Sequence, residues 1–127
     1  MDFNLGLVRH LGMKLLEASP DRVVAELEIR EEVCTLGGSI HGGTLMALAD
    51  TAGAAGTLAF LEKNPEAGKG TATLESKTNF FAGARSGKVR AESTPLHKGR
   101  RTHVWQTRVT DEAGKLLSLT IQTQMIL

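Results

Sequence analysis

The spacing of apolar and polar residues along the chain predicts an order of secondary-structure elements. Between residues 23 and 30, apolar side chains alternate with charged ones, which is the period of a half-buried strand. A Ser-Pro-Asp turn at residues 19–21 precedes this strand, and residues 13–17 are expected to form an earlier one. Residues 3–10 are predicted to form a short helix. The first third of the chain therefore contains two strands.

The middle of the chain has a different pattern. Residues 44–61 read TLMALADTAGAAGTLAFL, without Lys or Arg and rich in Ala and Gly. The stretch is near the lower length for a membrane span, but a carboxylate at Asp50 would cost about 2.5 kcal/mol or more in hydrocarbon. A helix that is apolar on all sides is typical of one enclosed by protein. We therefore expect a buried core helix that ends before Pro65, with Asn64 as a left-handed cap.

The remaining chain is strand-like almost to its end. The segments GARSG, HKGRR and DEAGK, each rich in turn formers, separate four predicted strands at 71–81, 88–96, 102–110 and 116–126. Short turns between successive strands predict an antiparallel meander, with the long helix across one face. The fold class is therefore α+β, in a single domain over residues 1–127. Sheet edges left open in such a fold are commonly paired by dimerisation.

Composition narrows the possible partners and the compartment. The 127 residues are 41% hydrophobic, and 15 Lys and Arg balance 14 Asp and Glu. This balance argues against an electrostatic nucleic-acid binder and against a polybasic membrane anchor. The single cysteine, Cys34, forms no intramolecular disulfide, and the first residues lack the order of a signal peptide. We expect a cytoplasmic protein with no nucleic-acid or membrane partner.

The glycine cluster at residues 37–43, GGSIHGG, is the first candidate for chemistry. It lacks the spacing of a phosphate-binding loop and does not follow the first strand of a βαβ unit. Gly42 and Gly43 fall in the first turn of the predicted helix, where backbone N–H groups have no partner and could bind an anion or an oxyanion. The alternative is that they ease a tight junction. His41 precedes them, either at the mouth of a site or as a capping residue.

Asp50 is the most anomalous residue in the sequence. Its neighbours in the helix are apolar, and the adjacent turns offer no cation. A desolvated carboxylate is costly, so it is retained where a distant group pairs with it or where it does chemistry. Asp50 lies about 12 Å along the helix axis from Gly42, too far to serve an oxyanion at its own helix start. An antiparallel helix from a second subunit could supply the missing partner.

The four histidines do not predict a metal site. His10, His41, His97 and His103 are scattered, and none has the spacing of a metal-binding pair. His97 and His103 flank a predicted turn, where we expect a solvated pair.

Several of these motifs together resemble one family. They are His41-Gly42-Gly43, Leu-Ala-Asp at 48–50, Ala-Gly at 52–53, TLESKTNFF at 73–81 and LHKGRR at 96–101. In this combination the chain resembles the hotdog-fold acyl-CoA thioesterases of the PaaI-like branch, which includes phenylacetate-pathway and 4-hydroxybenzoyl-CoA thioesterases. The resemblance begins near residue 31. It implies a long central helix wrapped by a curved antiparallel sheet, and a homodimer at least, with a homotetramer expected.

The resemblance also implies roles for individual residues. The N–H of Gly42 would donate to the thioester carbonyl, and Asp50 of the partner subunit would act as general base or nucleophile. His41 would help to shape the carbonyl site, and Thr73 would place a hydroxyl near the attacked centre. The family often has Asn or Gln six residues before the histidine, where this chain has Thr35.

The same resemblance implies which residues bind the substrate. Lys98, Gly99, Arg100 and Arg101 resemble the loop that meets the phosphates of coenzyme A, which is part of the substrate and not a separate cofactor. The implied reaction is hydrolysis of an aromatic or medium-chain acyl-CoA, for which neither a metal nor a redox cofactor is needed. The alternatives are another hotdog enzyme, such as a dehydratase or hydratase, and a non-catalytic acyl-CoA binding module.

Overall fold

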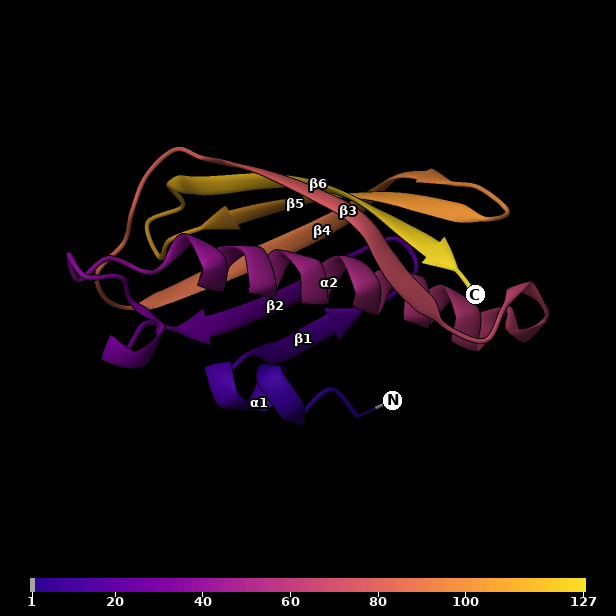
Figure 1. The fold of residues 1–127 in the computed structure, drawn as a ribbon, viewed down its shortest axis with the longest axis horizontal. Helices are drawn as coiled ribbons and strands as arrows, with labels where there is room; N and C mark the ends of the chain where they lie inside the picture. Colours follow the sequence, from indigo (N-terminus) through magenta and orange to yellow (C-terminus); the bar gives the residue numbers. More distant parts are fainter. Residues whose placement is uncertain (1) are drawn as a thin grey trace.

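The computed structural model describes residues 2–127, and it places one long helix across a curved, six-stranded antiparallel sheet (Figure 1). The strand order in the sheet is β1-β2-β4-β5-β6-β3, so β1 and β3 form its edges. In chain order the elements are α1 (Gly6–Leu11), β1 (Lys14–Ala18), β2 (Val23–Glu28), α2 (Gly42–Lys63), β3 (Thr71–Phe80), β4 (Lys88–Lys98), β5 (Thr102–Thr110) and β6 (Leu116–Ile126). The predicted α+β fold, a long helix against an antiparallel sheet, is confirmed.

Small corrections concern the ends of elements. The first helix begins at Gly6 rather than residue 3, and β4 continues past Pro95 to Lys98 through a register shift between Pro95 and His97. Asn64 does not adopt the predicted left-handed cap, because its φ is −134°. Its side-chain amide instead donates to the Phe60 carbonyl at 2.9 Å, which satisfies one of the last carbonyl groups of α2.

The small residues of α2 allow the helix to approach the sheet closely. A Cβ atom on Gly56 would lie 2.2 Å from the Trp105 ring, and one on Gly53 would lie 2.5 Å from the Gln122 side chain. A larger residue at either position would collide with the sheet. Although α2 is long and apolar enough to cross a membrane, 56% of its apolar window is buried inside the protein. It is the core helix of the fold, as its composition predicts.

A polar cluster lies in the same interface. The Thr57 hydroxyl oxygen accepts from Trp105 Nε1 at 2.9 Å and lies 3.1 Å from His103 Nδ1. His103 is fully buried, so the predicted solvated pair of His97 and His103 is wrong. The alternation along β5 places His103 on the same face as Trp105, which points into the core. Burial lowers the pKa of His103, and the nearby charges of Lys98 and His97 add to that effect.

This buried histidine should make stability depend on pH. The pKa of His103 lies below its unfolded value of 6.5, so below that pH the unfolded chain binds more protons than the folded chain. We expect the free energy of unfolding, measured by urea titration, to fall between about pH 7.5 and about pH 5.5, and to fall less in His103→Gln. Replacing the exposed His10 by Gln is the control and should keep the wild-type slope. Equal slopes in His103→Gln and wild type would contradict the assignment.

Candidate active site

The start of α2 leaves one backbone donor free. His41 occupies the N-cap position, and its Nδ1 atom accepts from the Gly43 N–H at 2.7 Å. The His41 carbonyl accepts from the N–H groups of Thr44 and Leu45. Among residues 2–127, none accepts a hydrogen bond from the Gly42 N–H. The histidine therefore caps the helix, and Gly42 presents the free donor of the first turn.

Asp50 is half-buried on α2, and its own sheet provides its partners. Its Oδ1 atom accepts from the Thr73 hydroxyl on β3 at 2.6 Å and from Gln122 Nε2 on β6 at 3.2 Å. The hypothesis that a second subunit supplies the missing partner is therefore not needed for Asp50 itself. Within residues 2–127 its Oδ2 atom has no hydrogen-bond partner, and it is not enclosed. One carboxylate oxygen is held and the other is available.

Two glutamines that the sequence analysis did not include in the site form hydrogen bonds around Asp50. Gln122 and Gln124 on β6 are fully buried, and Gln122 Nε2 donates to Gln124 Oε1 at 2.8 Å. Gln124 Oε1 also accepts from the Thr73 hydroxyl at 2.7 Å. The sequence carries a signal for them, because the two glutamines fall at positions of β6 whose side chains face the core. Polar residues at such positions are retained when they are hydrogen-bonded.

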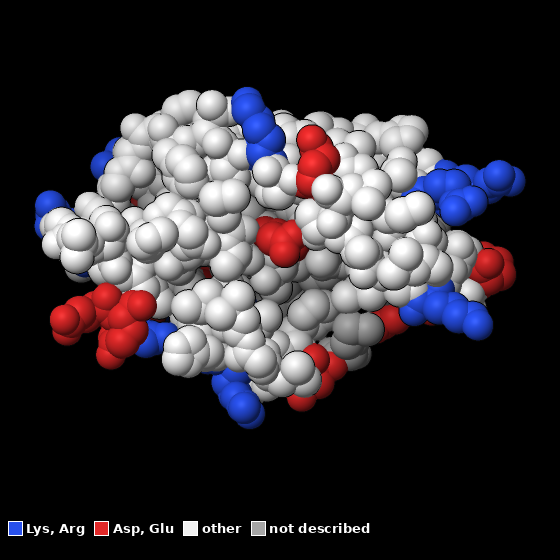
Figure 2. Space-filling model, in the orientation of Figure 1, with Lys and Arg blue, Asp and Glu red and all other residues white. Residues whose placement is uncertain are grey.

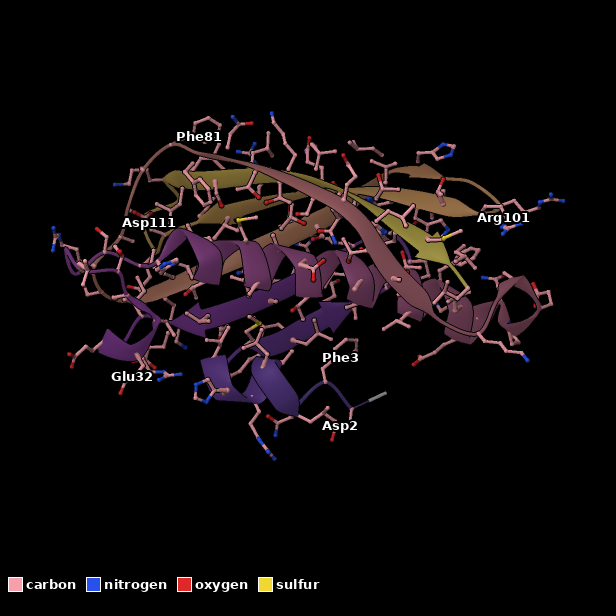
Figure 3. All side chains as sticks on the ribbon, viewed as in Figure 1. Asp2, Phe3, Glu32, Phe81, Arg101 and Asp111 are labelled. Carbon is pink, nitrogen blue, oxygen red and sulfur yellow. The ribbon has the colours of Figure 1, made fainter. Side chains whose placement is uncertain are left out.

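The structure joins some of the predicted site residues and separates others. Thr73 and Asp50 are in contact, whereas Gly42 lies about 12 Å from Asp50 along the helix axis. The hairpin between β4 and β5 is at the other end of the molecule from the start of α2 (Figure 1). Figure 3 shows the same separation, with Phe81 and Arg101 at opposite ends. A single chain therefore carries the parts of the predicted site in three places.

The predicted coenzyme A loop contains one lysine that is already paired. Lys98 Nζ lies 2.7 Å from Asp21 Oδ1 and 3.2 Å from the Pro20 carbonyl oxygen. The hydrogen bond from Lys98 to the Asp21 carboxylate lowers the pKa of Asp21. Gly99 turns the chain, because its N–H donates to the Thr102 carbonyl at 2.8 Å. Lys98 thus has a local role, anchoring the hairpin, in addition to any contact with a ligand.

Arg100 and Arg101 are the free cations of this loop. Both are exposed, and within residues 2–127 neither guanidinium forms an ion pair or a hydrogen bond. They line a hollow of about 630 Å³ that Phe60 and Ile126 also border. An anionic group with an apolar or aromatic neighbour would find both contacts there.

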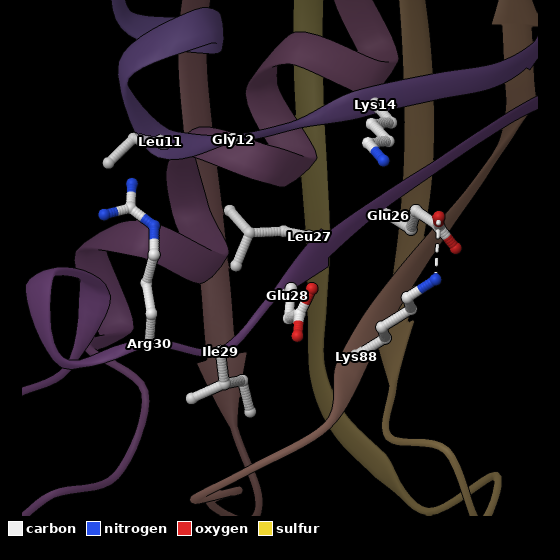
Figure 4. Close-up of a pocket in the computed structure, with 9 residues that line it drawn as sticks. All are labelled: Leu11, Gly12, Lys14, Glu26, Leu27, Glu28, Ile29, Arg30 and Lys88. Atoms are coloured by element: carbon white, nitrogen blue, oxygen red, sulfur yellow. Dashed lines mark ion pairs between the residues drawn. The ribbon is translucent and has the colours of Figure 1, made fainter.

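The charges elsewhere on the surface do not suggest a second centre. The face that carries α2 and β3 is largely uncharged, with acidic atoms near its middle (Figure 2). A hollow of about 340 Å³ beside β1 and β2 has charged walls, but Glu26 and Lys88 neutralise each other there at 3.5 Å (Figure 4). It contains none of the predicted site residues. Among residues 2–127, no three His, Cys, Asp or Glu side chains are grouped to hold a metal ion.

Comparison with known proteins identifies the class that this fold and site define, which is the hotdog thioesterases. Residues 37–118 match the thioesterase superfamily, and the chain belongs to that family. It is 31% identical over 115 residues to the 1,4-dihydroxy-2-naphthoyl-CoA hydrolase of Listeria monocytogenes, covering 91% of this chain and 90% of that protein. It is 34% identical over 110 residues to the proofreading thioesterase EntH of Klebsiella pneumoniae, covering 86% and 77%.

A solved structure agrees with the sequence matches. The chain superimposes on a mutant of the phenylacetic acid degradation protein PaaI from Thermus thermophilus with a TM-score of 0.83 and 30% identity, covering 94% of this chain and 97% of that one. The resemblance drawn from the sequence motifs is confirmed, and the protein is an enzyme of the thioesterase class.

Proposed function

We propose that the protein hydrolyses an acyl-CoA thioester, with an aromatic or medium-chain acyl group, to the free acid and coenzyme A. The observation that carries this proposal is the Asp50 carboxylate, which is held at Oδ1 and open at Oδ2. The activity named for the Listeria relative, on 1,4-dihydroxy-2-naphthoyl-CoA, supports an acyl-CoA substrate.

The proposed chemistry uses two groups. The Gly42 N–H donates to the thioester carbonyl oxygen and stabilises the negative charge that develops there, which is typically worth about 10²–10³ in rate. Asp50 acts as general base, taking a proton from water as the oxygen attacks the carbonyl carbon, or as nucleophile through Oδ2. The carbon–sulfur bond then breaks and coenzyme A leaves as the thiolate. With Asp50 as base the acyl group is released directly as the free acid. With Asp50 as nucleophile it remains as an anhydride on Oδ2, which water hydrolyses to the free acid and the regenerated carboxylate. His41 shapes the carbonyl site by capping the helix, and Thr73 holds the carboxylate.

This chemistry requires two chains. Because Gly42 and Asp50 of one chain are about 12 Å apart along the axis, we place Asp50 of the partner subunit beside Gly42. An antiparallel partner helix would make two equivalent sites. The edge position of β3 supports this arrangement, because an unpaired strand edge with the exposed side chains of Leu74 and Phe80 favours pairing with a second copy. We propose a homodimer at least, and a homotetramer as its further assembly.

The surroundings of Gly42 and of the hairpin support the substrate class. A Cβ atom on Gly42 would lie 3.1 Å from the Phe80 ring, so an aromatic side chain adjoins the proposed carbonyl site. Trp105, by contrast, is fully buried in the core and does not border it. Arg100 and Arg101 are free to bind the phosphates of coenzyme A. The proposal needs no metal or redox cofactor.

Replacing Asp50 by Asn tests the proposed reaction. Thiol release from a panel of aromatic and medium-chain acyl-CoA thioesters should identify a substrate for the wild type. On that substrate we expect kcat to fall by about 10²–10⁴ in Asp50→Asn with KM nearly unchanged, because the variant loses basicity but keeps size. Glu28→Gln, which removes an exposed carboxylate from β2, away from the proposed subunit edge, is the control and should keep the wild-type kcat.

Three results would contradict the proposal. An Asp50→Asn variant that is more stable and turns over normally would make Asp50 a structural residue only. Hydration of an enoyl-CoA without thiol release would indicate a hydratase. Binding of acyl-CoA without any turnover would indicate a binding module.

Charge removal at the hairpin tests the coenzyme A contact. Phosphates lie far from the reacting carbon and bind equally in the ground and transition states, so Arg100→Ala/Arg101→Ala should raise KM with little change in kcat. The effect should shrink as salt is added. The pair Arg90→Ala/Arg108→Ala, on exposed positions of β4 and β5, should leave KM unchanged. An unchanged KM in the hairpin variant at low and high salt would make the loop a solvated turn.

Mixing two inactive variants tests whether the site is shared. Gly42→Pro removes the proposed donor while suiting the helix, because proline is favoured at the first helical position and His41 is already extended. Gly42→Ala keeps the N–H and is the control for contact with Phe80. Exchange of subunits between Gly42→Pro and Asp50→Asn should restore one intact site per mixed dimer. Confirmed exchange without recovery would place both residues in one chain.

A further inference from the structure

Two buried glutamines fill the space between α2, β3 and β6, where apolar side chains would ordinarily pack. Gln122 and Gln124 are both 0% exposed. Gln122 Nε2 lies 3.2 Å from the Asp50 carbonyl oxygen, 3.2 Å from Asp50 Oδ1 and 2.8 Å from Gln124 Oε1. Gly53 makes this possible, because a Cβ atom there would lie 2.5 Å from the Gln122 side chain. The absence of a side chain at Gly53 leaves the space that the Gln122 amide occupies.

The direction of both amides follows from their partners. The ionised Asp50 carboxylate and its backbone carbonyl can only accept, so Gln122 must turn its NH₂ group toward them. Gln124 must then present Oε1 to Gln122, which directs its own NH₂ group to Thr71 Oγ1 at 3.0 Å. The Thr71 hydroxyl donates in turn to the Met125 carbonyl at 2.8 Å. A continuous series of hydrogen bonds therefore connects the backbone of β6 to Asp50, with Gln122 donating to both of its neighbours.

The Thr73 hydroxyl cannot by itself hold Asp50 Oδ1 at all times. This hydroxyl has one hydrogen, and two acceptors lie within reach, Asp50 Oδ1 at 2.6 Å and Gln124 Oε1 at 2.7 Å. When that hydrogen is directed to Gln124, Gln122 Nε2 is the side-chain donor that still holds Oδ1. One of its two hydrogens goes to Gln124 Oε1, and the other is shared between Oδ1 and the Asp50 carbonyl oxygen, each at 3.2 Å. Rotation of the carboxylate would break this contact. We propose that Gln122 and Gln124 are positioning residues that fix Oδ1 of Asp50 and thereby present Oδ2 as the reacting oxygen, an inference that rests on the proposed hydrolase function.

The Gln122 amide is not well suited to a packing role alone. Gln122 Oε1 is buried and has no hydrogen-bond partner within residues 2–127. An unsatisfied buried acceptor is destabilising, and an apolar side chain of the same shape would avoid it. The retained amide is accounted for by the donor that it supplies to Asp50.

The test uses isosteric apolar variants. In Gln122→Met, on the substrate that the wild type hydrolyses, we expect kcat to fall by about 10–10²-fold with KM nearly unchanged, because a misdirected base retains binding but loses alignment. The melting temperature should stay the same or rise. Gln124→Met, which leaves the contact with α2 intact, should cause a smaller loss of kcat. Thr120→Val is the control, because it breaks a partly buried hydroxyl pair with Thr78 between the same strands that does not include Asp50.

A double variant and a structure complete the test. In the Asp50→Asn background, Gln122→Met should cause no further loss of kcat, since it acts through the carboxylate that is already gone. Wild-type kcat in Gln122→Met, or losses that multiply in the double variant, would overturn the inference. Crystal structures of wild type and Gln122→Met give a readout without substrate. The Asp50 carboxylate should turn or take a second conformer in the variant, and an unchanged orientation would overturn the inference.

These outcomes distinguish the inference from the proposed function. Absence of thiol release by the wild type would remove the proposed hydrolase activity, whereas the orientation of the carboxylate in the two crystal structures would still decide whether Gln122 fixes it. If Gln122→Met does not fold, the same two measurements on Gln124→Met decide the question, with an unchanged kcat and an unchanged carboxylate counting against the inference.

Discussion

The close approach of α2 to the sheet is the constraint on which the other features depend. Gly56 lies against the Trp105 ring and Gly53 against the Gln122 amide, with no room for a Cβ atom at either place. Because helix and sheet are so close, a carboxylate on α2 can reach hydroxyl and amide groups of two strands. A helix built from larger residues would sit further out. The composition that stabilises the core is therefore also what allows a half-buried acid to be held by neutral donors.

Three parts of one helix, its start, its middle and its end, carry different groups of the candidate site. At its start, capping by His41 occupies one N–H group and leaves another free. In its middle, Asp50 is bound on one side and open on the other. Near its end, Phe60 borders the hollow of the two hairpin arginines. Because a helix separates these groups by fixed distances, a single chain does not bring them together, which is why the proposed site needs a partner subunit.

The sequence predicts those features that leave a periodic or local signal. Alternation identifies the strands, small apolar residues identify the core helix, and the motif around His41 identifies the start of α2. Alternation along β6 marks Gln122 as facing the core, but nothing in the sequence connects it to Asp50, because it is 72 residues away and neutral. The prediction that His103 is solvated is wrong for a related reason. A histidine beside a turn is usually solvated, and only the alternation of β5 directs it inward.

The ion pair between Lys98 and Asp21 has a consequence for ligand binding. It joins the β4–β5 hairpin to the turn between β1 and β2, so the base of the arginine-bearing loop is restrained before any ligand arrives. Asp21 is 82% exposed, so the contact is screened and weak enough to open. Restraint of this kind reduces the conformational entropy lost on binding. The loop is thus partly preorganised for the coenzyme A contact proposed above, while its two arginine side chains remain without ion-pair partners among residues 2–127.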